Sequence, residues 1–352
     1  MSGRIISYAE ALREATREAL SRDPAVFVIG LGAPDPKGIF GTTIGLAEAF
    51  PGRVLDMPVS ENAVTGMCIG AAMTGMRPLI THQRVDFALT AMEQIANQAG
   101  NWRYMFGGRR GLPLTMRMVI GRGWGQGPQH AQSLQATFAH FPGLKVLMPA
   151  TAADAGGLLL VALADDDPVI LLEHRWLHAS TSEVPERLRP LEIGKAVIRR
   201  HGRDVTIAAT SLMVLEALRA AEELSAAGIE AEVIDMRSIA PLDRECLLES
   251  VRRTGRFVAA DTGWHSFGAA AEMIATVSEG AFSSLNAPPV RVALPDAPSP
   301  TSPALAVAYY PGALEIGNTV RRLFGMPERP DAAADASPIG RDVPGKTFTG
   351  PF

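Results

Sequence analysis

Cysteine is nearly absent from the sequence, which holds only Cys68 and Cys246 in 352 residues. Two cysteines so far apart exclude a disulfide framework and a cysteine-based zinc site. Long apolar runs are absent too, since no stretch approaches the roughly 20 residues that a membrane helix needs. The N-terminal segment becomes charged too early for a secretory signal peptide. These absences predict a cytoplasmic protein without a membrane span.

The sequence also lacks an excess of charge of either sign. It has 33 Lys and Arg against 37 Asp and Glu, a net charge of −4 that is spread along the chain. A nucleic-acid-binding protein would normally show a basic patch or stripe, so nucleic-acid binding is not expected. Hydrophobic residues make up 47% and charged residues 20%, which is typical of a globular protein. A chain of this length is expected to form two domains.

Three common nucleotide and hydrolase motifs are missing. The sequence has neither G-x-x-x-x-G-K-[ST] nor G-x-S-x-G. Four glycines alternate over 121–127, but Gln126 stands where a dinucleotide-binding motif needs its last glycine. His174 and His178, beside Glu173, have the spacing of a metal-binding pair on a helix. That spacing is common by chance and the segment is polar, so we expect a surface role for them.

Apolar strand-like runs alternate with helical patterns in two successive blocks, which predicts an α/β protein. A capping box of Ser7 and Glu10 opens the first helix. Strands are expected at 26–29, 79–81, 114–119, 145–148, 169–173, 205–209, 231–234, 257–260 and 290–293. Further helices are expected after Ser60 and at 87–98, 152–164, 213–226, 244–253, 269–278 and 313–323. We therefore predict two domains, 1–180 and 194–326, each a mostly parallel sheet covered by helices, with a linker at 181–193 and a flexible tail at 327–352.

Three features are candidates for chemistry. Glu61 opens a helix rich in glycine and alanine, a composition that allows another group to approach closely. Phe87 lies at the start of a helix after a strand, and His130 follows the glycine-rich loop. Each also has a purely structural interpretation: Glu61 as a helix cap, Phe87 as a core aromatic, and His130 as a residue that ties down its loop.

At these places the sequence resembles a known family over most of its length, from Tyr8 to about Phe324. The matching segments include YAEALREA, VSENAVTGMCIGAAMTGMRP, FALTAMEQIANQAGNWRYMFGG, GPQHAQSLQATFAHFPGLKVLMPATAADAGGLL, DDDPVILLE, VIDMRSIAPLD, DTGW and VRVALPDAPSP. They are similar to the beta subunits of thiamine-diphosphate-dependent 2-oxo acid dehydrogenases, which act on pyruvate, branched-chain 2-oxo acids or acetoin. The resemblance implies a transketolase-like fold with a pyrimidine-binding domain and a transketolase C-terminal domain.

The resemblance assigns roles to the three features. It implies that Glu61 contacts a ring nitrogen of the aminopyrimidine of thiamine diphosphate. Phe87 matches the aromatic residue that packs on this ring, and Val59 matches the residue whose backbone lies against it. His130 matches an active-site histidine near the substrate carboxylate. The implied reaction is decarboxylation of a 2-oxo acid, followed by transfer of the acyl group to lipoamide.

The family also has a structural potassium site, built mostly from backbone carbonyls. The matching positions are Leu112, Leu114, Thr115, Ala162, Asp165 and Asp167. Three consecutive acidic residues at a helix C-terminus repel each other and the helix dipole, which a bound cation would relieve. A solvated acidic loop is the alternative interpretation.

The motif that holds the cofactor's magnesium ion in this superfamily, G-D-G, does not occur in the sequence. The resemblance therefore implies an alpha subunit that holds the Mg²⁺, in an α2β2 heterotetramer, and a possible lipoyl-bearing acyltransferase core as a further partner. An alternative function is that of a split transketolase-like or acyloin-forming subunit, which transfers the activated group to an aldehyde.

Two segments depart from the family pattern. Residues 30–33 read GLGA where the family usually has an acidic pair, and those acids are thought to link the two active sites. Residues 261–264 read DTGW instead of DEGW, on a face that contributes to docking of the acyltransferase core. The resemblance therefore does not carry active-site coupling over to this chain, and the 2-oxo acid is not identified.

Overall fold

The computed structural model describes residues 3–122 and 124–330. Contacts between residues divide this part of the chain into two compact units. Unit 1 contains 3–120 and 137–193, and unit 2 contains 121–136 and 194–330. The tail predicted at 327–352 lies outside the described residues from 331 onward.

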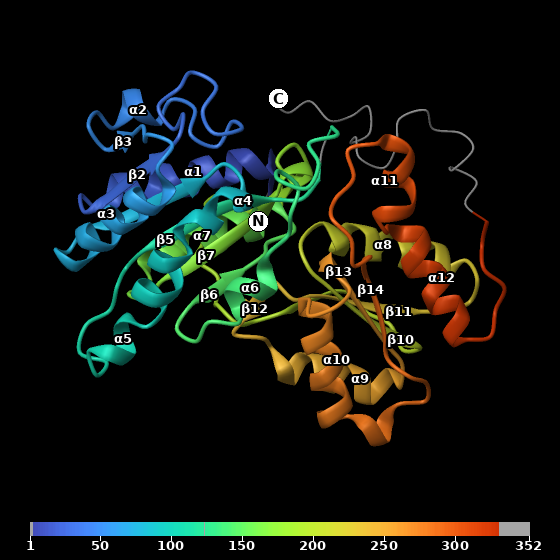
Figure 1. Cartoon of the computed structure of the whole chain (residues 1–352). Helices are drawn as coiled ribbons and strands as arrows, with labels where there is room; N and C mark the ends of the chain where they lie inside the picture. The colour runs from blue at the N-terminus through green and yellow to red at the C-terminus, as the bar shows by residue number, and fades with distance from the viewer. Residues whose placement is uncertain (1–2, 123, 331–352) are drawn as a thin grey trace. The chain divides into compact units, whose positions relative to one another are not determined.

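Unit 1 is built on parallel strands in the order β6-β7-β5-β4-β2-β3 (Figure 1). The strands are β2 (Val26–Gly30), β3 (Val54–Leu55), β4 (Arg77–His82), β5 (Thr115–Ile120), β6 (Lys145–Leu147) and β7 (Val169–His174). The central strands β5 and β7 are buried at every position and are mostly apolar, apart from Thr115, Arg117, Glu173 and His174.

Helices surround this sheet. They are α1 (Tyr8–Arg22), α2 (Leu46–Ala49), α3 (Glu61–Met73), α4 (Val85–Ala88), α5 (Trp102–Met105) and α7 (Ala152–Ala164), with α6 (Gln135–Ala139) at the boundary of the two units. The capping box predicted for α1 is present: Ser7 Oγ accepts from the Glu10 N–H, and the Glu10 carboxylate accepts from the Ser7 N–H. Helix α1 packs against α7.

Residues 85–105 differ from the single helix that the sequence predicts at 87–98. They form α4, a 3₁₀ helix (Leu89–Ala91), a π-helix (Glu93–Gly100) and α5. The linker region also contains more structure than expected. Within the predicted linker 181–193, β8 (Thr181–Val184) pairs antiparallel with β1 (Arg4–Ser7), and just before it a 3₁₀ helix (Arg175–Leu177) follows β7. Both of these strands are short and carry polar residues, so the spacing of apolar residues predicts neither a strand nor a helix there.

Unit 2 has a five-stranded sheet in the order β14-β13-β10-β11-β9. Its strands are β9 (Val197–Arg200), β10 (Val205–Ala209), β11 (Ala231–Asp235), β13 (Phe257–Trp264) and β14 (Val290–Leu294); the short β12 (Ser238–Ala240) follows β11. All neighbours are parallel except β9, which runs antiparallel to β11.

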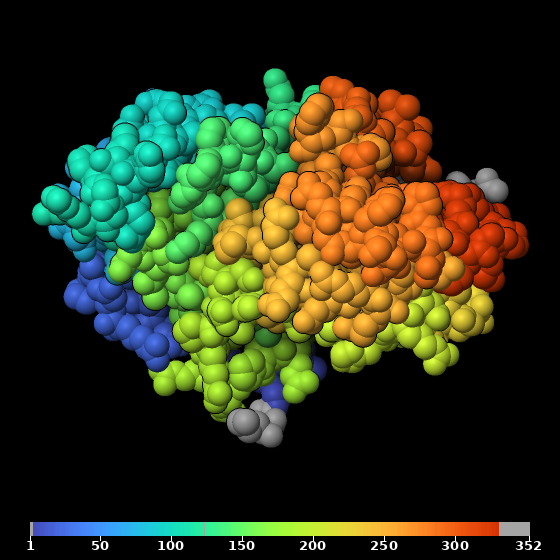
Figure 2. Space-filling model, turned by 90° about the horizontal axis from the view of Figure 1, so that it is seen from below, coloured from blue at the N-terminus to red at the C-terminus, as the bar shows by residue number. Residues whose placement is uncertain are grey.

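Helices cover both faces of the sheet in unit 2. They are α8 (Leu212–Ser225), α9 (Arg244–Thr254), α10 (Ala269–Gly280), α11 (Pro303–Tyr309) and α12 (Ala313–Leu323), with a 3₁₀ helix (Phe282–Ser284) after α10. Helices α8 and α12 pack together on one face, and α9 and α10 pack on the other (Figure 1). The latter two form much of the orange surface that faces the viewer in Figure 2. Beneath them lies a core that includes Leu247, Val251, Phe257, Met273 and Val277. The predicted fold class is confirmed.

No helix in the described ranges 3–122 and 124–330 is long and apolar enough to cross a membrane.

Candidate active site

The residues predicted to contact the cofactor follow two strands that flank β2. Strand β2 pairs in parallel with both β3 and β4, so the carboxyl ends of all three lie at one edge of the sheet. The chain leaves β3 through Val59 and enters α3 at Glu61, and it leaves β4 to enter α4, which contains Phe87. In open α/β sheets, ligands bind at this edge. The topology of unit 1 thus places Val59, Glu61 and Phe87 at one edge of the sheet.

Glu61 is the first residue of α3 and is half-buried. The helix cap at Ser60 has no side-chain hydrogen bond, and no hydrogen bond or ion pair engages the Glu61 carboxylate among the described residues. A carboxylate in the first helical turn lies at the positive end of the helix dipole, which stabilises its charge. Glu61 therefore does not close a capping box, and its carboxylate is open to a ligand.

Val59, two residues earlier, exposes 74% of its side chain. Ser60 beside it is also exposed. A β-branched apolar side chain with most of its surface uncovered fits a site that another molecule completes.

Phe87 is half-buried in α4, on an element in contact with the helix that carries Glu61. Helix α3 packs on α4, on the 3₁₀ helix after it and on the π-helix. Gly66 makes this approach possible, because a Cβ there would lie 3.3 Å from Gln94 Oε1 of the π-helix. By contrast, a Cβ at Gly70 would meet nothing within 4 Å in this chain. The π-helix was not predicted, and such helices occur frequently at functional sites.

His130 belongs to unit 2, whereas Val59, Glu61 and Phe87 belong to unit 1. It is half-buried, and its backbone N–H donates to Gly127 O over 3.3 Å. Gly125 and Gly127 have φ angles of +69° and +70°, where side chains are strained. A Cβ on Gly127 would also lie 2.5 Å from Thr301 Cγ2. The glycines of this loop are therefore required by its turns and by its contact with Thr301; Gly123 lies outside the described residues.

The positions predicted for potassium lie together in unit 1, where Thr115 Oγ1 donates to Ala162 O over 3.0 Å. Leu112, Leu114 and Ala162 are buried. The backbone carbonyls of all three accept hydrogen bonds within the chain, from Leu114 N–H, Val169 N–H and Asp165 N–H respectively. The potassium site stays a prediction.

The acidic run 165–167 already has cationic partners within the chain. Lys145 Nζ lies 2.7 Å from both carboxylate oxygens of Asp165 and 3.7 Å from Asp167 Oδ2. Arg103 pairs with Asp167, and Arg77 pairs with Asp166. These side chains relieve the repulsion that the sequence argument assigned to a bound cation, so charge alone does not require an ion there.

The expectation of a surface role for His174 and His178 is wrong. Both side chains are 2% exposed, and Glu173 is fully buried. Glu173 forms a bidentate ion pair with Arg117, with Arg117 Nη2 2.8 Å from Oε2, and His178 Nε2 lies 3.1 Å from the same oxygen. The residues sit at the end of β7 and just beyond it rather than on a helix, so the helical spacing was misleading. In the described ranges, no group of three or more His, Cys, Asp or Glu side chains is placed to hold a metal ion.

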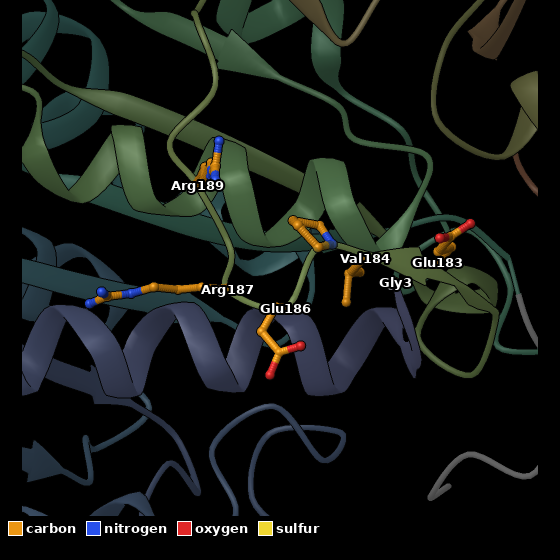
Figure 3. A pocket seen from close by; sticks show the side chains of 7 residues that line it. Gly3, Glu183, Val184, Glu186, Arg187 and Arg189 are labelled. Atoms are coloured by element: carbon orange, nitrogen blue, oxygen red, sulfur yellow. The ribbon is translucent and has the colours of Figure 1, made fainter. Parts of the chain in front are cut away.

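A surface groove lies beside α1 and is separate from the predicted site. It is lined by Gly3, residues 183–187 and Arg189 (Figure 3). Its walls carry both acidic and basic side chains, and it shares no residue with Val59, Glu61 or Phe87. The residues predicted to contact a cofactor lie at the carboxyl edge of the sheet and not in this groove.

Comparison with family models identifies both units. Residues 4–179 match the transketolase pyrimidine-binding domain, and residues 194–316 match the transketolase C-terminal domain.

The chain is similar to named proteins over nearly its whole length. It is 41% identical over 329 residues to the acetoin:2,6-dichlorophenolindophenol oxidoreductase subunit beta of Cupriavidus necator, covering 91% of this chain and 97% of that protein. It is 38% identical over 319 residues to the pyruvate dehydrogenase E1 component subunit beta of Rickettsia felis, covering 90% and 98%. Among solved structures, a split-gene transketolase described as an inactive β4 tetramer matches with a TM-score of 0.75 and 27% identity, covering 92% of this chain and 99% of that one.

Proposed function

The chain belongs to the family that combines a transketolase pyrimidine-binding domain with a transketolase C-terminal domain, and on this premise we propose that it is the beta subunit of a two-subunit 2-oxo acid dehydrogenase. Such an enzyme depends on thiamine diphosphate, decarboxylates a 2-oxo acid and passes the acyl group to lipoamide. The proposal is supported by 38–41% identity to pyruvate and acetoin dehydrogenase beta subunits.

The main structural support for the proposal is the carboxylate of Glu61 at the carboxyl edge of the sheet. It is half-buried and has no hydrogen-bond or ion-pair partner among the described residues. It fits an aminopyrimidine, since a carboxylate without a partner in the chain can hold a proton against a ring nitrogen. Phe87, half-buried on the neighbouring element, fits a residue that covers the flat face of such a ring. Val59 would present its backbone to the same ring.

The thiazolium of the bound cofactor supplies the electron sink for loss of carbon dioxide. Glu61 holds and shares the proton that sets the tautomer of the pyrimidine. Phe87 orients the ring and excludes water from one face. His130 acts at the substrate end, where it pairs with the carboxylate of the 2-oxo acid or moves a proton during acyl transfer.

An alpha subunit completes the site in this proposal. The sequence has no G-D-G motif, so the Mg²⁺ that binds the diphosphate would be held by the partner. The 74% exposure of Val59 agrees with a half-site that the partner covers. We further propose an α2β2 assembly, delivery of the acyl group to a lipoyl-bearing acyltransferase, and a structural K⁺ site at Leu112, Leu114, Thr115, Ala162, Asp165 and Asp167.

A second candidate function is a split transketolase-like subunit that transfers the activated group to an aldehyde. The structural match to a split-gene transketolase favours it, although the identity is 27% against about 40% for the dehydrogenase subunits. Both functions use Glu61 alike and differ in the acceptor. Assays of the assembled enzyme with lipoamide and with an aldehyde acceptor discriminate between them.

The test of the proposed function is Glu61→Gln in the chain assembled with its alpha subunit. We expect turnover of 2-oxo acids to fall roughly 10²–10³-fold, because one preorganised interaction with the reacting system is lost. The melting temperature should stay unchanged, since the Glu61 carboxylate has no partner among the described residues. Glu48→Gln is the matched control, because Glu48 is an exposed acid in the first turn of α2. Wild-type turnover in the Glu61→Gln enzyme would refute the assignment.

A further inference from the structure

Unit 2 has its topological switch point between β10 and β13. From β10 the chain passes through α8 to β11 on one side, and then through α9 to β13 on the other side of β10. The carboxyl ends of β10 and β13 are where an open α/β sheet usually binds a ligand. Here the polar residues at those ends are Thr210, directly after β10, and Asp261 and Thr262 in β13.

A side chain from the loop segment 121–136 occupies this position. Gln135 is 1% exposed, and its Nε2 donates to Asp261 Oδ1 over 2.7 Å. Thr262 Oγ1 lies 3.4 Å from the same nitrogen. Thr210 Oγ1 also donates to Asp261 Oδ1 over 2.7 Å. The carboxyl group of Asp261 is thus a buried acceptor that binds Gln135 and Thr210 together.

The backbone around this contact is shaped to admit the amide. A Cβ on Gly263 would lie 3.0 Å from Gln135 Nε2 and 3.0 Å from Asp261 Oδ2, closer than side chains normally pack. Burial raises the pKa of Asp261, and hydrogen bonds from Thr210 and Gln135 oppose that rise. The neutral Gln135 amide hydrogen-bonds Asp261 Oδ1 without adding a charge, whereas Asp261 Oδ2 has no hydrogen-bond partner among the described residues.

Gln135 lies near the C-terminal end of the segment 121–136, which carries His130. This segment contacts the rest of unit 2 on both sides of the histidine. The Gly121 N–H donates to Gln132 O over 3.2 Å. The Arg122 guanidinium lies 4.5 Å from the centre of the Tyr310 ring. Gly125 and Gly127 lie against Thr301. The Gln135–Asp261 bond is a fully buried attachment on the C-terminal side of His130.

We infer that Gln135 and Asp261 are positioning residues that fix the loop carrying His130, so that the histidine reaches the substrate from a rigid base. This inference rests on the proposed function, because it gives the pair a role in the step assigned to His130. Catalytic groups must be held within a fraction of an ångström, and a shift of about 1 Å can cost roughly 10²-fold in rate. A loop with several glycines needs such an attachment, since its own backbone resists displacement weakly.

The experiment compares Gln135→Leu, which removes the amide donor and keeps a similar volume, with wild type in the assembled holoenzyme. Ser250→Ala is the matched control, because Ser250 Oγ donates to the buried Glu232 elsewhere in unit 2. Hydrogen exchange of residues 124–134 reports on the loop independently of activity. Function is measured as the rate of acyl transfer and the affinity for thiamine diphosphate. Both are also measured in the double variant Gln135→Leu/His130→Ala.

We expect amide exchange in 124–134 to rise at least about tenfold in Gln135→Leu and to stay unchanged in Ser250→Ala. Acyl transfer should fall roughly 10–100-fold, while cofactor affinity stays within about threefold. In the His130→Ala background, Gln135→Leu should cause no further loss, because both changes disable the same step. The swap Gln135→Glu/Asp261→Asn, which exchanges the amide and the carboxyl group, should recover more activity than Gln135→Glu alone.

Unchanged exchange in Gln135→Leu overturns the inference, and so does a loss of rate that adds in full to that of His130→Ala. A wild-type rate in His130→Ala also overturns it, since no histidine step would then exist to be positioned. Failure of the proposed function gives a different result: Glu61→Gln would keep wild-type turnover whatever the exchange of 124–134 shows.

Discussion

The ion pair between Arg117 and Glu173 gives the sharpest prediction about the stability of unit 1. Both side chains are fully buried, in the neighbouring central strands β5 and β7. Burial opposes ionisation of Glu173, yet the charge and hydrogen bonds of Arg117, helped by His178, lower the pKa of Glu173 from 4.5 to about 2. At about 1.4 kcal/mol for each tenfold change in the proton equilibrium, this corresponds to about 3 kcal/mol of stability at neutral pH.

Arg117→Met removes the cation and leaves a carboxylate buried between two strands. Breaking a buried pair in this way costs about 3–5 kcal/mol. For a unit of this size, a loss of about 3 kcal/mol lowers the melting temperature by about 6–12 °C. Differential scanning calorimetry of the full chain at pH 7 measures the shift.

Arg22→Met is the matched control within unit 1. Arg22 pairs with Glu18 over 2.7 Å but is 56% exposed, so water screens the pair. Its loss should cost less than about 1 kcal/mol. The double variant Arg117→Met/Glu173→Met should be more stable than Arg117→Met, because no unpaired charge stays in the core. Equal melting temperatures for Arg117→Met and Arg22→Met would refute the reasoning.

The sign of the pH dependence follows from the lowered pKa of Glu173. The stabilisation is fully present above the unfolded value of 4.5 and is lost as the pH falls through the folded value of about 2. Arg117→Met lacks this contribution at every pH. The difference in melting temperature between wild type and variant should therefore shrink as the pH is lowered below about 4.5. A difference that is constant from pH 7 to pH 3 would show that lost packing, and not the buried charge, explains the effect.

Three further outcomes are expected. The isolated chain should bind thiamine diphosphate negligibly in calorimetry with Mg²⁺, and micromolar binding would contradict the two-subunit site. His130→Ala in the assembled enzyme should lower acyl-group turnover roughly 10²–10⁴-fold with cofactor affinity within a few-fold; equal losses of affinity, turnover and melting temperature would favour a purely structural histidine. Gly127→Ala should destabilise the loop by about 1–2 kcal/mol or more, since φ there is +70° and a Cβ would meet Thr301 Cγ2 at 2.5 Å. Hydrogen exchange of 124–134 measures this, and wild-type exchange would contradict it.

The sequence predicts the buried elements of the fold well, because burial on both faces leaves a continuous apolar run. The predictions at 152–164, 205–209 and 313–323 agree with α7, β10 and α12 in their bounds. The sequence misses five strands of the described part of the chain. Strands β3 and β12 have only two and three residues, and β1, β8 and β9 have four each and carry polar or charged side chains. Their pairing partners come from distant or irregular segments, so no local pattern marks them.

The candidate site likewise contains residues with a local sequence signal and contacts between distant residues that have none. Glu61 and Phe87 could be predicted from the sequence because each follows a strand and lies within a recognisable motif, and they stay predictions. The Gln135–Asp261 contact joins residues 126 positions apart, and the buried pair Arg117–Glu173 joins residues 56 apart. A single Arg inside an apolar strand was a signal for a buried partner, but only the register of β5 against β7 identifies it.

The turn after β2 shows how the chain accommodates the loss of the acidic pair expected there. Gly32 has φ of +67°, and its N–H donates to Asp56 Oδ1 over 2.8 Å. Leu31 O accepts from Gln83 Nε2 over 2.6 Å, and Ala33 is fully buried. Neutral and backbone groups thus help to close the turn, and two acidic residues contact it: Asp56, from the segment that leads to Glu61, and Asp35, whose Oδ2 would lie 3.0 Å from a Cβ on Gly32. Residues 30–33 supply no carboxylate of their own, so the coupling role of the family's acidic pair does not carry over to these positions.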